Sequence, residues 1–141
     1  MRVYKVVKRW KDRLYSACYL PLRRAGWCVE YLPHQWALPY PGSKLFACRS
    51  LEEARRLVET LSVDGLDPSY EIWEAEAEGT DSLRWFVLDL TSWNLQKFWE
   101  KPEHRRYIPC WRFSPGWVAA DRLCLLRKVE LQESQEEGGS R

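Results

Sequence analysis

The segment Tyr70–Glu78 sets the kind of sheet that this chain can form. Three glutamates alternate along it with one aromatic and two small residues: Glu74, Glu76 and Glu78 with Trp73, Ala75 and Ala77. Successive side chains of a strand point to opposite faces, so one face is predicted to be buried and the other to meet water. Ile72 beside Trp73 breaks the period and allows a bulge. The glutamate row is interpreted as a solvated face rather than as an acid–base site.

Other segments rich in β-branched and aromatic residues are separated by turn signals. Strands are predicted at Arg2–Trp10, Leu14–Leu20, Trp27–Leu32, Lys44–Cys48, Arg84–Leu90 and Arg122–Leu131. Lys11-Asp12 marks a turn, and residues 33–43, with three prolines, are expected to form an irregular loop. A crossover from Lys44–Cys48 to Tyr70–Glu78 allows those two strands to pair in parallel.

Ser50 begins the clearest helix. With Glu53 it matches a capping box, and apolar residues then recur at helical spacing to Leu61. A shorter helix is predicted at about 93–100, after Ser92 as a cap. The fold class is therefore α+β, with a mostly antiparallel sheet, one well-defined helix at about 50–61 and one short helix. We expect one domain over 1–131 and a disordered polar tail over 132–141.

Composition excludes several classes of protein. Lys and Arg number 22 against 20 Asp and Glu, a net charge of +2, which argues against binding to duplex nucleic acid. No segment reaches the roughly 20 apolar residues of a membrane span. The five cysteines contain no CxxC pair, which favours reduced thiols in the cytoplasm and argues against structural zinc. No nucleotide-binding loop or hydrolase motif is present, so neither an enzyme, a metal site nor a cofactor is predicted.

The chain contains nine tryptophans, an unusually high number for its length. Trp10, Trp27 and Trp73 lie in predicted strands and are assigned to the core. The others include four that crowd with arginines into residues 93–117, where flat rings suit stacking on a base and guanidinium groups suit phosphate. The alternative is that these rings fill the core and an oligomer interface.

Three weaker candidates accompany that segment. The loop 33–43 with His34 and Trp36 is either the lid of a pocket or a packed connector. The Pro-Gly turn at 114–118 is able to cradle an anion. Cys110 and His104 lie near each other in sequence, and we interpret them as a buried thiol and a surface histidine rather than as a catalytic dyad.

The order of these pieces resembles a known family. The chain opens with Arg-Val-Tyr-Lys-Val-Val, continues with Lys-Leu-Phe-Ala-Cys-Arg-Ser-Leu-Glu-Glu-Ala and Tyr-Glu-Ile-Trp-Glu-Ala-Glu, and reaches Ser-Pro-Gly-Trp-Val-Ala-Ala-Asp-Arg-Leu. Over residues 2–130 it is similar to a group of small phage-borne proteins that includes the first class of Thoeris anti-defence proteins. One departure is Trp117, where a small hydroxyl residue is expected after the glycine, and it weakens an anion-binding role for that turn.

The resemblance implies a sponge that binds cyclic nucleotide immune signals in the host bacterial cytoplasm without cleaving them. Its ligands would be cyclic ADP-ribose isomers and, in some members, cyclic oligonucleotides, held between protomers of a homo-oligomer. The matching positions assign base stacking to Phe86 and Trp93, a base or ribose edge to Asn94, and the pyrophosphate to three arginines: Arg105, Arg106 and Arg112. The alternative function is a protein-binding inhibitor or adaptor with a Trp/Arg-rich interface. An enzyme acting on nucleotides is the third hypothesis.

Overall fold

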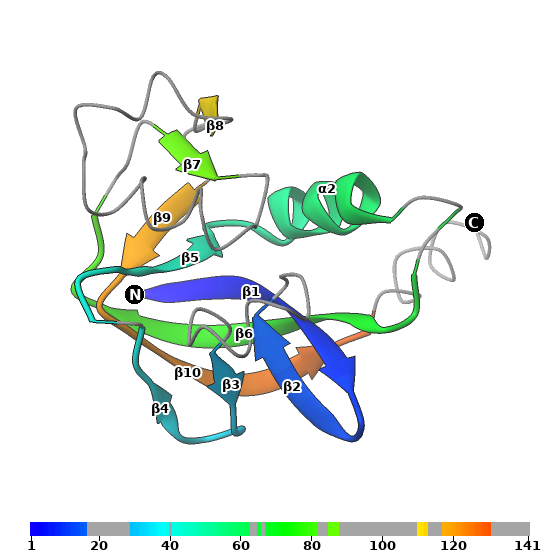
Figure 1. The fold of residues 1–141 in the computed structure, drawn as a ribbon, viewed down its shortest axis with the longest axis horizontal. Coiled ribbons are helices and arrows are strands. Elements are labelled where there is room, and N and C mark those ends of the chain that lie inside the picture. The colour runs from blue at the N-terminus through cyan, green and yellow to red at the C-terminus, as the bar shows by residue number, and fades with distance from the viewer. Residues whose placement is uncertain are drawn as a thin grey trace.

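An antiparallel sheet flanked by one helix makes up most of the described structure (Figure 1). The structure is a computed structural model that describes residues 1–16, 29–39, 41–62, 65, 67–81, 85–87, 110–112 and 117–130. Its elements are β1 (Arg2–Trp10), β2 (Arg13–Ser16), β3 (Glu30–Tyr31), β4 (Trp36–Ala37), β5 (Leu45–Cys48), α2 (Leu51–Leu61), β6 (Tyr70–Glu78), β7 (Trp85–Val87), β8 (Cys110–Arg112), β9 (Trp117–Ala120) and β10 (Arg122–Val129). The expected α+β class is confirmed.

The main sheet has the strand order β3-β2-β1-β6-β10-β4, and β5 joins it by pairing with β1 and β9. Every ladder between its described strands is antiparallel. The parallel pairing considered for Lys44–Cys48 and Tyr70–Glu78 is therefore wrong, because β5 pairs through Cys48 with Tyr4 of β1 instead. The chain returns from α2 into β6 on the other side of β1.

The sheet is curled, and the inside of the curl holds the larger core. Tyr31 of β3 and Trp73 of β6 are separated by two strands in the sheet order, yet both belong to the same apolar cluster. We call this side the concave face. Its buried residues include Val3, Val7 and Leu125, together with small residues such as Ala75. The curl brings β2, β3 and β4 around below β1 and β6 in Figure 1.

The helix α2 covers part of the opposite, convex face. Ser50 is its N-cap and accepts a hydrogen bond from the Glu53 backbone N–H at 3.2 Å, as predicted for one half of a capping box. Its fully buried residues, Ala54 and Val58, pack with Val6 and Ile72 of the sheet. The period that Ile72 was expected to break is therefore intact, because this apolar residue lies in the glutamate row where the helix covers it.

Beyond the helix, the convex face of β6 carries the glutamate row in water. Glu76 and Glu78 are 38% and 49% exposed, which confirms the predicted solvated face. Basic groups of the neighbouring strands pair with it: Arg2 with Glu74 and Glu76, and Arg122 with Glu78 at 2.5 Å. The bulge allowed in β6 lies instead in β10, between Leu125 and Arg127.

The other predicted elements have different outcomes in the structure. Irregular structure was expected throughout 33–43, but β4 forms there because Trp36 and Ala37 pair with Cys124 and Leu123. Strand β2 confirms the start of Leu14–Leu20, and β7 and β10 confirm parts of the last two predicted strands. The expected helix at 93–100 and the tail at 132–141 lie outside the described residues.

Candidate functional site

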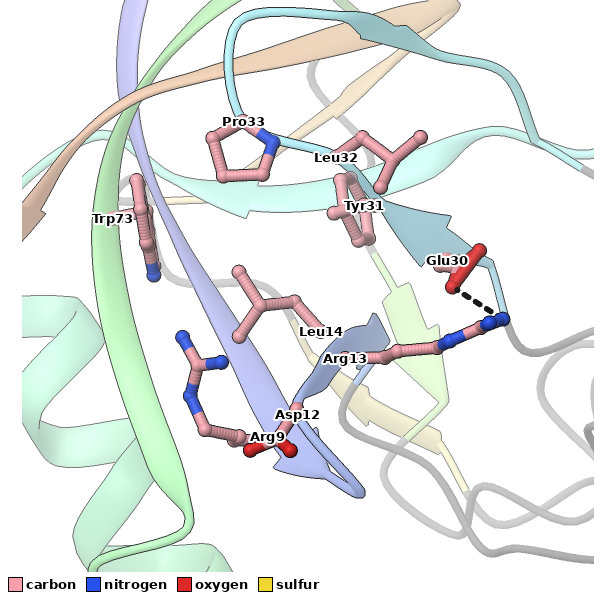
Figure 2. Close-up of a pocket in the computed structure, with 9 residues that line it drawn as sticks. All are labelled: Arg9, Asp12, Arg13, Leu14, Glu30, Tyr31, Leu32, Pro33 and Trp73. Atoms are coloured by element: carbon pink, nitrogen blue, oxygen red, sulfur yellow. Dashed lines mark hydrogen bonds and ion pairs between the residues drawn. The ribbon is translucent and has the colours of Figure 1, made fainter.

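A cavity opens at the end of the concave face where β1 turns into β2. Its volume is about 410 Å³, within the range of small-molecule sites. The residues that line it are Arg9, Asp12, Arg13, Leu14, Glu30, Tyr31, Leu32, Pro33 and Trp73. Figure 2 shows Trp73 on one side and Tyr31 on the other, with Leu14 between them and Arg9 and Asp12 at the lower edge. The walls are therefore aromatic and apolar, and the charged groups lie at the rim.

The β1–β2 hairpin positions the charged rim. Trp10 pairs with Arg13, so the loop contains only Lys11 and Asp12, and both have positive φ (49° and 64°). Two left-handed residues in a two-residue loop are typical of a type I′ turn, whose twist matches that of the strands it joins. The tight turn places Asp12 and Arg13 beside the cavity, and Arg13 contacts Glu30 of β3 at 3.3 Å.

A second short turn forms the upper wall, at Leu32 and Pro33. The Gln35 backbone N–H donates to the Leu32 carbonyl at 3.1 Å, and His34 adopts a left-handed φ of 67°. The His34 backbone N–H donates to the Leu125 carbonyl of β10 at 2.8 Å. The sequence allows residues 33–43 to form either a lid or a packed connector. In the structure, the start of this segment is attached to the sheet through His34, and Pro33 also lines the cavity.

Glu71 organises the side of the cavity that Trp73 forms. Its carboxylate is only 6% exposed and accepts hydrogen bonds from Arg9 Nε at 2.5 Å and from Trp73 Nε1 at 3.0 Å. Burial by itself raises the pKa of Glu71, but the bonds from Arg9 and Trp73 and the charge of Lys128 outweigh it and hold the pKa below its ordinary value. Glu71 is therefore a charged anchor that fixes both the indole and the guanidinium.

One lysine lies beneath the aromatic wall. Lys5 is 8% exposed, and its Nζ donates to the Phe46 carbonyl at 2.6 Å. The same Nζ lies 5.7 Å from the centre of the Tyr31 ring, a cation–π contact. Lys5 is also in register with Trp73 across β1 and β6. The two aromatic residues of the cavity therefore share a buried cationic neighbour.

The described residues that line the cavity include none of those predicted for ligand binding. Phe86 and Arg112 are in β7 and β8, which pair in register Phe86 with Trp111 and Arg112 with Trp85, so the fold brings these two strands together. Trp93, Asn94, Arg105 and Arg106 lie outside the described residues, as do His104 and most of the 114–118 turn. The assignment of these positions stays a prediction.

Sequence reasoning missed Trp73 and Glu71 as site residues. Trp73 was assigned to the core, whereas the structure packs it against the core and leaves it partly exposed at the cavity. The available signal was Glu71, which the alternation of β6 places on the same face as Trp73 and Ala75. A carboxylate on a buried face needs a partner, and that requirement marks its surroundings as a polar site within the core.

The other reactive groups among the described residues include two buried cysteines. Burial raises the pKa of the Cys48 thiol to about 12, and Cys124 is likewise buried and free. No group of three or more His, Cys, Asp or Glu side chains able to hold a metal ion occurs among the residues described. Within the same residues, no helix is both long and apolar enough to cross a membrane.

Comparisons with protein-family models, with curated proteins and with solved structures found no match.

Proposed function

We propose that this protein binds a cyclic nucleotide signal and sequesters it without cleaving it, with the cavity beside Trp73 as the binding site. The observation that carries the proposal is the cavity itself, which combines the partly exposed ring of Trp73, backed by the buried Tyr31, with arginines at its rim. Flat rings suit stacking on a base, and guanidinium groups supply hydrogen bonds to polar substituents. The choice of cyclic nucleotides within this class rests on the resemblance of the sequence to phage anti-defence proteins.

A retention experiment tests the proposal. The purified protein is incubated with cyclic ADP-ribose isomers, separated from free ligand and heat-denatured, and the released material is analysed by mass spectrometry. Intact ligand in the supernatant is the expected result, since a sponge holds its ligand unchanged. A degraded ligand would identify an enzyme, and the absence of any retained nucleotide would overturn the proposal.

Two variants locate the site in the same assay. Trp73→Ala is expected to abolish retention, whereas Trp10→Ala removes a tryptophan that packs on Tyr15 outside the cavity and is expected to leave retention intact. Arg112→Ala tests the alternative location in β8 that the sequence predicts. Loss of retention in Arg112→Ala but not in Trp73→Ala would move the site away from the cavity.

A protein-binding role is the second candidate, and exposed apolar side chains between Leu32 and Leu38 favour it. Leu32, Trp36 and Leu38 are 51%, 40% and 67% exposed, and the Arg122 guanidinium lies 4.2 Å from the centre of the Trp36 ring. Tryptophan and arginine are enriched among the residues that dominate binding energy in protein interfaces. If this surface joins copies of the chain, light scattering will show an oligomer that Trp36→Ser dissociates. A monomer in both proteins would contradict the expected homo-oligomer.

A further inference from the structure

The described charged residues that line the cavity are balanced in sign. The four charged residues of its lining are two arginines and two acids: Arg9, Arg13, Asp12 and Glu30. Behind them, Glu71 and Lys128 add one charge of each sign at a separation of 4.0 Å. The buried Lys5 adds one further positive charge, but its Nζ donates to the Phe46 carbonyl at 2.6 Å beneath Tyr31 rather than at the rim. Among the described residues the rim has no positive excess, so a ligand with two phosphates would bring negative charge that these residues do not offset.

The Arg9 guanidinium at the rim is also held in place by Glu71. Arg9 donates from Nε and from a terminal nitrogen to Glu71, at 2.5 and 3.2 Å. Because the Glu71 carboxylate is almost fully buried, moving Arg9 from it to a phosphate group would leave a buried negative charge without its partner, which is costly. A guanidinium has five N–H donors, so Arg9 keeps donors that Glu71 does not use, without offering an uncompensated charge.

The orientation of the Trp73 indole suits stacking on an uncharged ring. The indole N–H of Trp73 is directed to Glu71, which satisfies the polar edge of the ring. Figure 2 shows the indole close to edge-on, with a flat face turned toward Leu14 and Tyr31 across the cavity. A planar heterocycle resting on the exposed part of the indole would find a stacking partner, N–H donors on Arg9 and carboxylate acceptors on Asp12 and Glu30.

We infer that this cavity recognises the base of its ligand, an uncharged heteroaromatic ring with hydrogen-bonding edges, and leaves the phosphates outside. The inference rests on the proposed function for the identity of the natural ligand. Its consequence is that a nucleoside binds about as well as the corresponding nucleotide. Binding also depends little on salt, because stacking and neutral hydrogen bonds are screened far less than charge pairs.

Calorimetric titration tests this directly. Adenosine, guanosine, cytidine and uridine, and their 5′-monophosphates, are titrated into the full chain at about 50 mM and about 500 mM NaCl. For the base that binds best, the two Kd values are expected to agree within about threefold and to change by no more than about threefold with salt. Nucleotide binding that is tenfold tighter and falls steeply with salt would overturn the inference.

Variants at Trp73 complete the test. Trp73→Leu is expected to weaken nucleoside binding about tenfold or more, the loss typical of removing an aromatic partner from a stacked base. Trp73→Phe keeps a ring and is expected to retain most of the affinity, which also serves as the control for folding. Trp10→Leu, which alters a tryptophan outside the cavity, is expected to bind like the unmodified chain. Equal loss in Trp73→Leu and Trp10→Leu would contradict the inference.

The result separates this inference from the proposed function. Retention of cyclic ADP-ribose without binding of any nucleoside would leave sequestration standing and overturn recognition of the base. Binding of a nucleoside without retention of any cyclic nucleotide would leave base recognition standing and overturn sequestration. Failure of both experiments would overturn both.

Discussion

At the scale of single residues, Glu71 is the group on which the cavity depends most. Removing its charge in Glu71→Gln leaves the Trp73 N–H an acceptor but weakens the charged bonds from Arg9. Hydrogen bonds to charged groups contribute about 1.5–3 kcal/mol, so we expect a loss of that size in the free energy of unfolding at neutral pH. Urea denaturation measures it. Glu78→Gln, which alters an exposed pair, is the control and should cost less than about 1 kcal/mol.

The stabilising effect of the Glu71 charge is expected to depend on pH. Because the pKa of Glu71 is lowered in the folded protein, its contribution is fully present above the ordinary glutamate pKa of about 4.3. As the pH falls from there through the lowered folded value, that contribution is lost. The stability difference between the unmodified chain and Glu71→Gln should therefore narrow in acid. A difference that stays constant down to the acid limit would show that the charge of Glu71 is not what stabilises this region.

At the scale of elements, the N-cap of α2 is expected to stabilise that helix. Ser50→Ala removes the side-chain acceptor for the Glu53 N–H and should lower the free energy of unfolding by about 1 kcal/mol. Thr60→Ala changes an exposed residue near the other end of the same helix and should change it by less than about 0.5 kcal/mol. Chemical denaturation compares the two, and equal effects would mean that the cap does not support α2.

Gly79 ends β6 in a conformation that glycine adopts freely. Its φ is +67°, and a Cβ there would lie 2.7 Å from the Asp121 Cβ. Asp121 is itself held by Lys44 at 3.1 Å, so the clash would disturb a contact between two turns. Gly42→Ala, also at positive φ but with open space, should cost about 1 kcal/mol, and Gly79→Ala clearly more. Melting temperatures in the reverse order would contradict the role given to Asp121.

The elements were predictable to different degrees for physical reasons. Strands Arg2–Trp10 and Tyr70–Glu78 have the predicted bounds, because their patterning is local and turn residues end them. Strand β4 was not predictable, because its two residues adopt strand structure only through their pairing with β10, which is distant in sequence. The cavity was not predictable for the same reason: Trp73 and Tyr31 are distant in sequence and meet only because the sheet curls. Local pattern does not encode that curvature.

At the scale of the whole molecule, small side chains allow the concave face to close around its core. Ala75 and Ala77 of β6 are at most 2% exposed and face larger residues such as Leu125. Ala75→Leu adds volume to a filled space and should destabilise the fold by about 1–3 kcal/mol. Thermal unfolding with circular dichroism provides the measurement. Unchanged stability would show that the concave core has room for a larger side chain.

The sheet order also has a consequence for how the chain folds during synthesis. Strand β6 lies between β1, near one end of the chain, and β10, near the other. One edge of β6 therefore stays unpaired until β10 has left the ribosome, and open edges are sites of aggregation in partly folded chains. The glutamates of β6 place negative charge beside that edge throughout the delay. Charged residues that flank an open edge oppose its pairing with another chain, and in the finished fold Glu78 and Glu74 pair with Arg122 and Arg127.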